Sequence, residues 1–428
     1  MRKMNYFKQA TAFFILIICL LGTSNAQNRI SSPYSRFGFG DLMLNQHSSM
    51  MPMGGIYNAY SSNLHINPFN PASYIGLDSM SFVFETGVSG ISSTLKTQSL
   101  SQDADYLSLS NLLFGFQIKN WWKGSFGLIP YSSVGYQIID KQTEPFIGNV
   151  NYQYEGKGGL NQLYIGNAFK IGEKLAVGFN TNLLFGSIER YKSVYFPDTS
   201  TLFNTRVTNT ITVKSLTFNV GMQYKTPINN DYTLTFGATG QLPMSLNAHR
   251  DQLAYSFYES TSGLVYPIDT IESIQNEKGT IKLPAGFGVG FVIEHNQHWL
   301  IGADFNYKSW SDYESFGIKD SLKDSWNIAV GGEIKPNPFS KNYFGRVTYR
   351  AGFRYNTTYL QIKNNQLNEF GISFGLGLPL RKSKSTVNLG VEFGKRGTTD
   401  NNLIEENFIR FTVGFSAYDI WFVKRKYD

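Results

Sequence analysis

Apolar residues alternate with small or polar ones through most of the chain, in segments of about ten residues separated by turn-rich intervals. In 370–380, for example, Phe370 opens an apolar face and Gly371 opens a small, polar one. The segments 385–394 and 405–418 repeat the pattern. Because a period of two is the signature of a β-strand with two unlike faces, the sequence predicts an all-β protein.

The same criterion predicts about fourteen strands, a number suited to one large antiparallel barrel. They are expected near 80–94, 107–118, 122–139, 160–170, 174–187, 205–225, 231–245, 281–294, 298–308, 324–335, 344–357, 367–380, 385–394 and 405–418. The longest intervals between them are predicted to be loops at one end of the barrel: 140–159, 188–204, 246–280 and 309–323.

The strands of a soluble β-sandwich would show the same alternation, so we use composition to choose between a sandwich and a membrane barrel. The chain is 15% aromatic and only 16% charged, whereas soluble domains average about 25% charged residues. Aromatic residues such as Trp299, Tyr307 and Trp326 stand near strand ends, as in the aromatic girdles of membrane barrels. A bilayer admits β-structure only as a closed barrel, so we predict a transmembrane antiparallel barrel over 79–428.

The N-terminus predicts export. Arg2, Lys3 and Lys8 precede the uncharged apolar stretch 10–22, and Ala26 ends a small-residue cleavage site. The stretch is too short to cross a hydrocarbon core of about 30 Å, so 1–26 is interpreted as a signal peptide rather than an anchor. The only cysteine, at position 19, leaves with it, and the remaining weak positive charge predicts no nucleic-acid partner. The expected location is the outer membrane, in contact with its lipid.

A barrel of this size has a lumen that must be filled. The segment 27–78 is rich in Ser, Asn, Gly and Pro, with several Met residues between them. We interpret it as an N-terminal plug folded inside the lumen; the alternative is a disordered periplasmic tail.

Charged residues fall on the polar faces of several strands. They are predicted to face the lumen: Arg346, Arg350, Arg354, Asp304, Glu333, Glu392 and Arg410. Buried charges of mixed sign are expected to pair, which favours a network that braces barrel and plug. The alternative is an Arg row that binds an anionic head group such as a carboxylate.

Short motifs carry a family resemblance. Asn70-Pro71-Ala72 before the first strand, Leu283-Pro284-Ala285-Gly286-Phe287 and the Trp299–Asp304 segment resemble the FadL-like, TodX-type outer-membrane transport family. Ser32-Pro33-Tyr34-Ser35-Arg36-Phe37-Gly38 is similar to its branch in Bacteroidetes. The resemblance implies a plug–barrel junction at Asn70, Pro71 and Ala72, passive uptake of a hydrophobic or amphipathic small molecule, and lateral exit through the third strand.

Pro130 stands in the predicted third strand, where a proline removes a ladder hydrogen bond. It is the candidate for the lateral opening, with an ordinary bulge as the alternative. The same branch also resembles barrels that no longer transport and serve as accessory subunits of outer-membrane machines, in barrel assembly or type IX secretion. Partners in an outer-membrane complex are therefore the second hypothesis.

The sequence contains no motif that predicts an enzymatic reaction. The chain lacks a Gly-x-Ser-x-Gly elbow, a phosphate loop and a His-Glu-x-x-His motif, which enzymes of the common hydrolase and nucleotide classes carry. The sequence therefore predicts no enzyme, no catalytic residue, no cofactor and no metal site.

Overall fold

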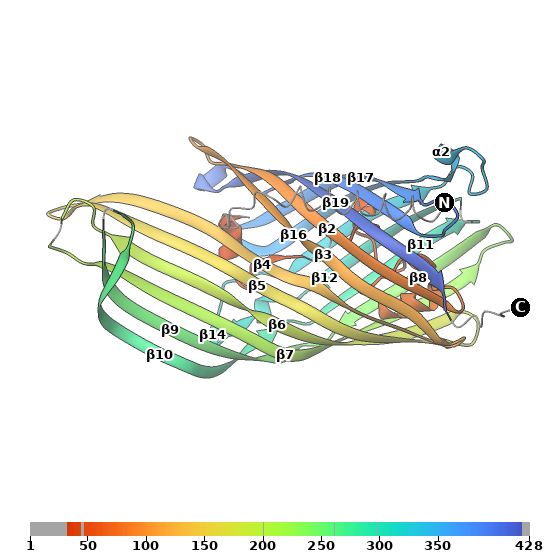
Figure 1. The fold of residues 1–428 in the computed structure, drawn as a ribbon, viewed down its shortest axis with the longest axis horizontal. Helices are drawn as coiled ribbons and strands as arrows, with labels where there is room; N and C mark the ends of the chain where they lie inside the picture. The colour runs from red at the N-terminus through yellow and green to blue at the C-terminus, as the bar shows by residue number, and fades with distance from the viewer. Residues whose placement is uncertain (1–31, 44–46, 200, 261, 297, 422–428) are drawn as a thin grey trace, which may run out of the picture.

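The computed structural model describes residues 32–43, 47–199, 201–260, 262–296 and 298–421. In these residues one antiparallel sheet closes on itself as a barrel (Figure 1). The closing pair joins β19 (Glu405–Ile420) to β2 (Ser81–Lys96), in register over the whole length of both strands. The predicted all-β barrel is thus confirmed, while the predicted signal peptide, 1–26, lies outside the described residues.

The other strands follow in chain order. They are β3 (Ser101–Lys119), β4 (Trp122–Glu144), β5 (Gly148–Ile171), β6 (Leu175–Tyr195), β7 (Asn204–Pro227), β8 (Tyr232–Gln241), β9 (Met244–Glu259), β10 (Val265–Leu283), β11 (Gly286–His295), β12 (Trp299–Lys308), β13 (Glu314–Ser315), β14 (Ile318–Lys319), β15 (Ser325–Ile334), β16 (Thr348–Ile362), β17 (Asn365–Pro379) and β18 (Thr386–Arg396). The short helices are η4 (Trp310–Asp312), α2 (Tyr343–Arg346) and η5 (Asp400–Asn402). No described helix is long and apolar enough to cross a membrane.

Prolines divide two of the wall strands. β7 pairs first with β9 and then with β8, on either side of the break at Pro243. β10 and β11 likewise continue one another across Pro284. Proline cannot donate to the ladder, so the strand is interrupted there. We count β8 with β9, and β10 with β11, as one wall strand each, and we assign the short β13 and β14 to a loop. The described residues then form a barrel of fourteen strands, as predicted.

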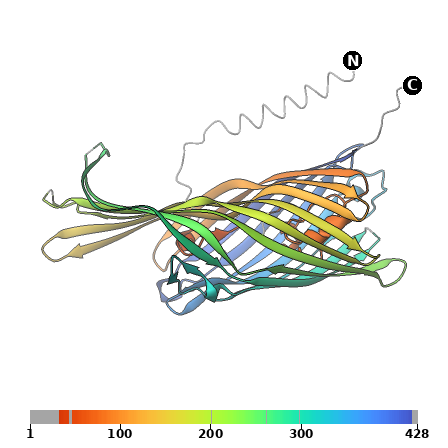
Figure 2. The same ribbon diagram turned by 90° about the horizontal axis from the view of Figure 1, so that it is seen from below.

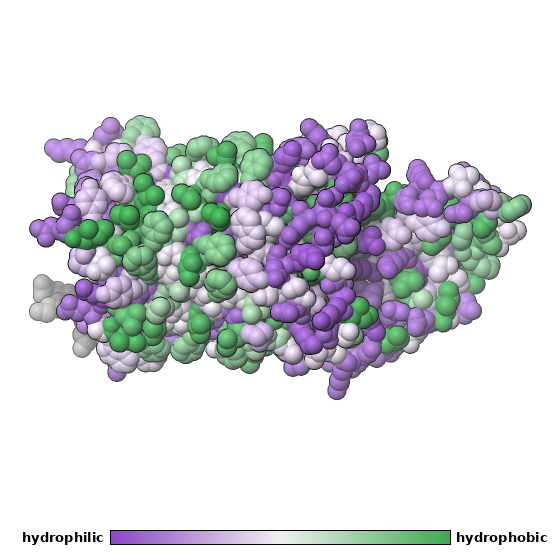
Figure 3. Space-filling view, turned by 180° about the vertical axis from the view of Figure 1, so that it is seen from behind, coloured by the Kyte–Doolittle hydropathy of each residue, from purple (hydrophilic) through white to green (hydrophobic). Residues whose placement is uncertain are grey.

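The two faces of the wall follow the alternation in the sequence. On β19, Phe411, Val413 and Phe415 are exposed on the outside, whereas Thr412 and Ser416 between them are buried inside. On the face of the barrel that Figure 3 shows, apolar side chains form a broad band, which we call the apolar belt. A belt of this kind suits contact with hydrocarbon.

Several strands extend far beyond the barrel (Figures 1 and 2). The far parts of β4–β7, β9 and β10 form a sheet that we call the distal sheet. It occupies most of 140–159, 188–204 and 246–280, so the prediction that these segments are loops is wrong. Its strand β10 was missed because its apolar residues Ile268, Ile271 and Ile274 stand three residues apart and so lack the period of two.

The described part of the N-terminal segment, from Ser32 to Asp78, lies inside the barrel (Figure 1). It contains η1 (Pro33–Arg36), β1 (Asp41–Leu42), η2 (Met51–Met53) and η3 (Pro71–Gly76). Met51, Met53 and Ile56 are fully buried. We call this segment the plug.

Candidate functional site in the plugged lumen

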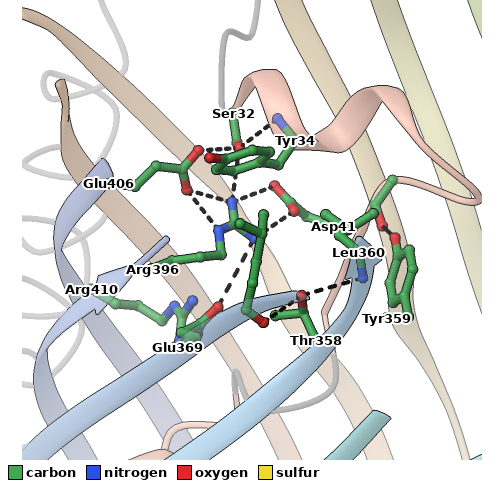
Figure 4. Close-up of polar contacts among 12 residues, drawn as sticks. Ser32, Tyr34, Asp41, Thr358, Tyr359, Leu360, Glu369, Arg396, Glu406 and Arg410 are labelled. Atoms are coloured by element: carbon green, nitrogen blue, oxygen red, sulfur yellow. Dashed lines mark hydrogen bonds and ion pairs between the residues drawn. The ribbon is translucent and has the colours of Figure 1, made fainter. Parts of the chain in front are cut away.

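Arg396 on β18 joins the start of the plug to the wall (Figure 4). Its guanidinium donates to Asp41 Oδ1 at 2.8 Å, to Ser32 Oγ at 2.8 Å and to Glu406 Oε2 at 2.7 Å. Asp41 and Ser32 belong to the plug, and Glu406 belongs to β19. A charged side chain that is removed from water destabilises the fold unless it is paired. This cluster therefore holds the start of the plug against the wall.

The middle of the plug is held by two wall carboxylates. Asp304 on β12 accepts hydrogen bonds from the backbone N–H groups of Tyr57, at 2.6 Å, and Asn58, at 2.8 Å. Glu85 on β2 accepts from the N–H of Ile66 at 2.8 Å, and its other oxygen lies 2.7 Å from His65 Nδ1. Hydrogen bonds to charged acceptors are the stronger kind, and these come from opposite sides of the wall.

The remaining predicted lumen charges pair mostly with one another. Arg350 donates to Glu333 at 2.8 Å and to Asn388 at 2.8 Å. Arg354 and Arg410 both donate to Glu392, at 2.9 Å and 2.7 Å. Arg350 and Arg354 also lie on one face of β16 and are buried, so the arrangement resembles the predicted network more than an open anion site.

Arg346 is the exception. It lies in α2, in the turn that precedes β16, and not on the polar face of that strand. The prediction that it shares one strand face with Arg350 and Arg354 is therefore wrong. Pro336 and Pro338 stand just after β15 ends at Ile334, where a proline cannot donate to the ladder.

Glycines let the plug backbone touch the wall backbone. A Cβ at Gly352 would lie 2.0 Å from the N atom of Gly54, and one at Gly331 would lie 2.1 Å from the O atom of Met53. Gly54 itself has φ of +68° and donates its N–H to Ser373 Oγ at 3.1 Å. Side chains at these wall positions would exclude the plug.

The Asn-Pro-Ala turn lies deep in the lumen. Asn70 caps η3 by accepting a hydrogen bond from Ala72 N at 3.0 Å, and Pro71 occupies the first helical position. A Cβ at Gly178 on β6 would lie 2.6 Å from the carbonyl C of Pro71. The turn therefore docks on β6 and β7, several residues before the chain enters β2 at Ser81.

Pro130 lies beside an interruption in the wall. Within the described residues, pairing between β3 and β4 runs only from Lys119↔Trp122 to Leu112↔Leu128. Beyond Leu128, the edge of β4 pairs with the plug instead, through Leu42↔Ser132 and Asp41↔Ser133. Pro130 itself stands at a bulge in the β4–β5 ladder. We call this interruption the β3–β4 seam, and β1 covers it.

A cavity of about 190 Å³ lies next to the seam. Its walls include Leu42 and Met43 of the plug and Tyr106 of β3. Its lining also contains the aromatic residues Tyr57, Tyr307, Trp310, Trp326, Tyr359 and Phe408, with Arg354 and Arg396 at one side. An engineered apolar cavity of about 150 Å³ can hold benzene, so this space is large enough for one small aromatic molecule.

Sequence reasoning missed three of the wall residues that bind the plug. Glu85, Arg396 and Glu406 are on inward positions of their strands, and extending the alternation analysis to every charged residue would have found them. The partners of Arg396 in the plug, Ser32 and Asp41, belong to no periodic segment. Only the folded structure reveals them.

Comparison with known proteins identifies the family. The sequence model of BamG matches residues 7–428. The chain belongs to the BamG family. No curated protein matches the sequence.

Solved structures share the fold of this BamG-family chain at low identity. The toluene transporter TodX of Pseudomonas putida is 16% identical, with a TM-score of 0.56 over 90% of this chain and 100% of that one. The toluene transporter TbuX of Ralstonia pickettii is 13% identical, with a TM-score of 0.58 over 92% and 99%. A Pseudomonas aeruginosa FadL homologue is 14% identical, with a TM-score of 0.55 over 89% and 98%.

These likenesses show that the chain has the fold of a FadL-like β-barrel. In such barrels the short turns face the periplasm and the long extensions face outward. The turns at the end that holds Ser81 and Ile420 are short, for example between β5 and β6 and between β7 and β8. We therefore propose that this end is periplasmic and that the distal sheet is extracellular.

Proposed function

We propose that this BamG-family protein is a non-transporting subunit of an outer-membrane complex, to which it contributes its extracellular distal sheet as a docking surface. The observation that carries the proposal is the exposure of large apolar residues on this sheet, beyond the belt that lipid covers. On β9 and β10 they include Leu253 at 41%, Tyr258 at 53%, Tyr266 at 52%, Ile268 at 46% and Ile271 at 63% exposed. Such groups on a water-facing surface mark interaction sites.

The fixed plug supports the same proposal. Wall residues on opposite sides of the barrel, among them Glu85, Asp304 and Arg396, bind it. Each charge-assisted hydrogen bond contributes about 1.5–3 kcal/mol, so displacing the plug as a unit would cost far more than thermal energy supplies. A barrel with a fixed plug is suited to a structural role. A machine for barrel assembly or for type IX secretion is the proposed setting, and Bacteroidetes is the proposed source because of the 32–38 segment.

The test is co-purification from the native outer membrane. A variant with Tyr266→Ser, Ile268→Ser and Ile271→Ser should lose its envelope partners while the barrel stays folded. The matched control, Ile171→Ser with Ile228→Ser, changes exposed apolar residues at the periplasmic end and should keep them. Equal recovery of partners by both variants would contradict docking through the distal sheet.

Passive uptake is the second candidate, favoured by the β3–β4 seam and the cavity beside it. In this alternative, a small hydrophobic molecule such as a monoaromatic occupies the aromatic-lined cavity. It then leaves sideways near Pro130 when β1 separates from β4. The structural neighbours TodX and TbuX, described as toluene transporters, support the substrate class.

A further inference from the structure

The outer wall of the barrel carries an open groove of about 870 Å³ at its periplasmic end. It crosses β12, β15, β16, β17 and β18. The floor of the groove contains two small residues, Gly332 on β15 and Ala351 on β16, which are paired across the two strands. Large side chains stand on both sides of these two, Ile301 on β12 and Phe374 on β17.

The groove lies within the apolar belt. Ile301, Ile334 and Phe374 at its rim are 55%, 50% and 51% exposed, on the face that bilayer hydrocarbon covers. The depression arises because the two small residues stand where neighbouring strands carry Ile and Phe. Its shape and apolar lining suit an acyl chain that lies against the wall.

The turn at the periplasmic end of the groove has the composition of a membrane interface. It joins β15 to β16, and Phe339, Tyr343 and Phe344 in it are 90%, 40% and 69% exposed. Tyr349, which lines the groove, donates its hydroxyl to the carbonyl of Phe344 at 3.2 Å. Aromatic residues of this kind anchor barrels at head-group level, and here they stand at the end of the groove.

The same end is strongly cationic. The turns 335–347 and 380–385 contain Lys335, Lys341, Arg346, Arg381, Lys382 and Lys384 and no acidic residue. Among the described residues, only Lys384 of these six forms a salt bridge, with Asp78. Glu333, which precedes Lys335, is bound to Arg350. The other five charges remain available to an anion, and Arg346 lies 5.7 Å from the ring of Tyr343.

We propose that this groove and the cationic turns form a binding site for one anionic phospholipid of the periplasmic leaflet. An acyl chain lies over Gly332 and Ala351, and the phosphate lies among Lys335, Lys341 and Arg346. Apolar contact alone would accept any lipid, whereas the uncompensated cations select a negative head group. The site is independent of the proposed function, since the distal sheet contributes no residue to it.

The test is native mass spectrometry of the full-length mature protein in mild detergent, with phosphatidylglycerol added as the probe. Wild type should retain one phosphatidylglycerol. Ala351→Phe, which fills the groove, should weaken its retention at least tenfold. Ala238→Phe is the matched control, because Ala238 shares the outer face of β8 with exposed Phe236; it should retain the lipid.

Charge is tested separately. A variant with Lys335→Gln, Lys341→Gln and Arg346→Gln should lose the preference for phosphatidylglycerol over phosphatidylcholine. A control with Lys119→Gln and Lys174→Gln, at distant periplasmic turns, should keep it. Heat-modifiability on gels verifies folding of every variant. Equal retention by wild type and Ala351→Phe would overturn the proposal, as would a second protein copy or another envelope protein bound in place of lipid.

Discussion

The guanidinium of Arg396 lies 2.8 Å from the carboxylate of Asp41 and so connects β18 of the wall to β1 of the plug. The same side chain binds Ser32 and Glu406. Arg396→Gln would leave the buried Glu406 and the partly exposed Asp41 without their cation, and breaking a buried pair typically costs about 3–5 kcal/mol. We expect a large drop in the free energy of unfolding, measured by urea titration in lipid vesicles.

Lys395→Gln is the control for that variant. Lys395 is 41% exposed and pairs with Glu405 on the surface, where an ion pair contributes about 1 kcal/mol or less. A similar loss in both variants would show that Arg396 does not hold the plug.

Close approach of two backbones gives a second prediction. Gly352→Ala places a methyl group 2.0 Å from the N atom of Gly54, and no side-chain rotation relieves that contact. The plug should shift away from β16, at a cost of about 1–3 kcal/mol. Limited proteolysis should then cut within the plug. In Gly240→Ala the nearest atom is Val220 Cγ2, at 3.3 Å, and the plug should stay resistant; cleavage of both or neither would contradict the account.

The stability of the segment that leads into β2 is expected to depend on pH through Asp78. Burial alone would raise the pKa of Asp78, but hydrogen bonds from Lys384, Tyr418 and Asn63 outweigh it and lower the pKa below 3.8. Because the folded pKa is the lower one, this stabilisation is complete above the unfolded value. It disappears as pH falls through the folded value.

Hydrogen exchange measures this effect. After correction for intrinsic rates, protection of the 77–80 amides should fall as pH drops below about 4 in wild type. Asp78→Asn should show lower protection at pH 4 and little further change. Identical profiles would mean that Asp78 does not fasten this segment.

The seam can be locked reversibly. Leu42 and Ser132 are paired across β1 and β4, and paired antiparallel residues are close enough for a disulfide. If uptake occurs by lateral exit, Leu42→Cys with Ser132→Cys should block toluene entry when oxidised and restore it when reduced. A control pair, Gln153→Cys with Ser193→Cys, joins β5 to β6 and should have no effect. Equal entry in all states would exclude a route through β1.

The alternation of apolar and polar residues was enough to predict the wall, because each strand there has one face toward lipid and one toward the lumen. It failed where that asymmetry ends. In β10, for example, Ile268, Ile271 and Ile274 stand three residues apart, and Ile268 and Ile271 are exposed, so no period of two marks this strand. Arg350, Arg354 and Asp304 were found because they interrupt a polar face with charge. Asp41 and Ser32 were not found, since their roles depend on contacts more than 350 positions away.

Native mass spectrometry of the tagged protein, extracted from its own outer membrane in mild detergent, tests the central claim most directly. A stoichiometric assembly with other envelope proteins, lost when Tyr266, Ile268 and Ile271 are changed to Ser, is the predicted result. A lone barrel that carries a small hydrophobic adduct in its lumen would contradict the subunit role and would make passive uptake the function.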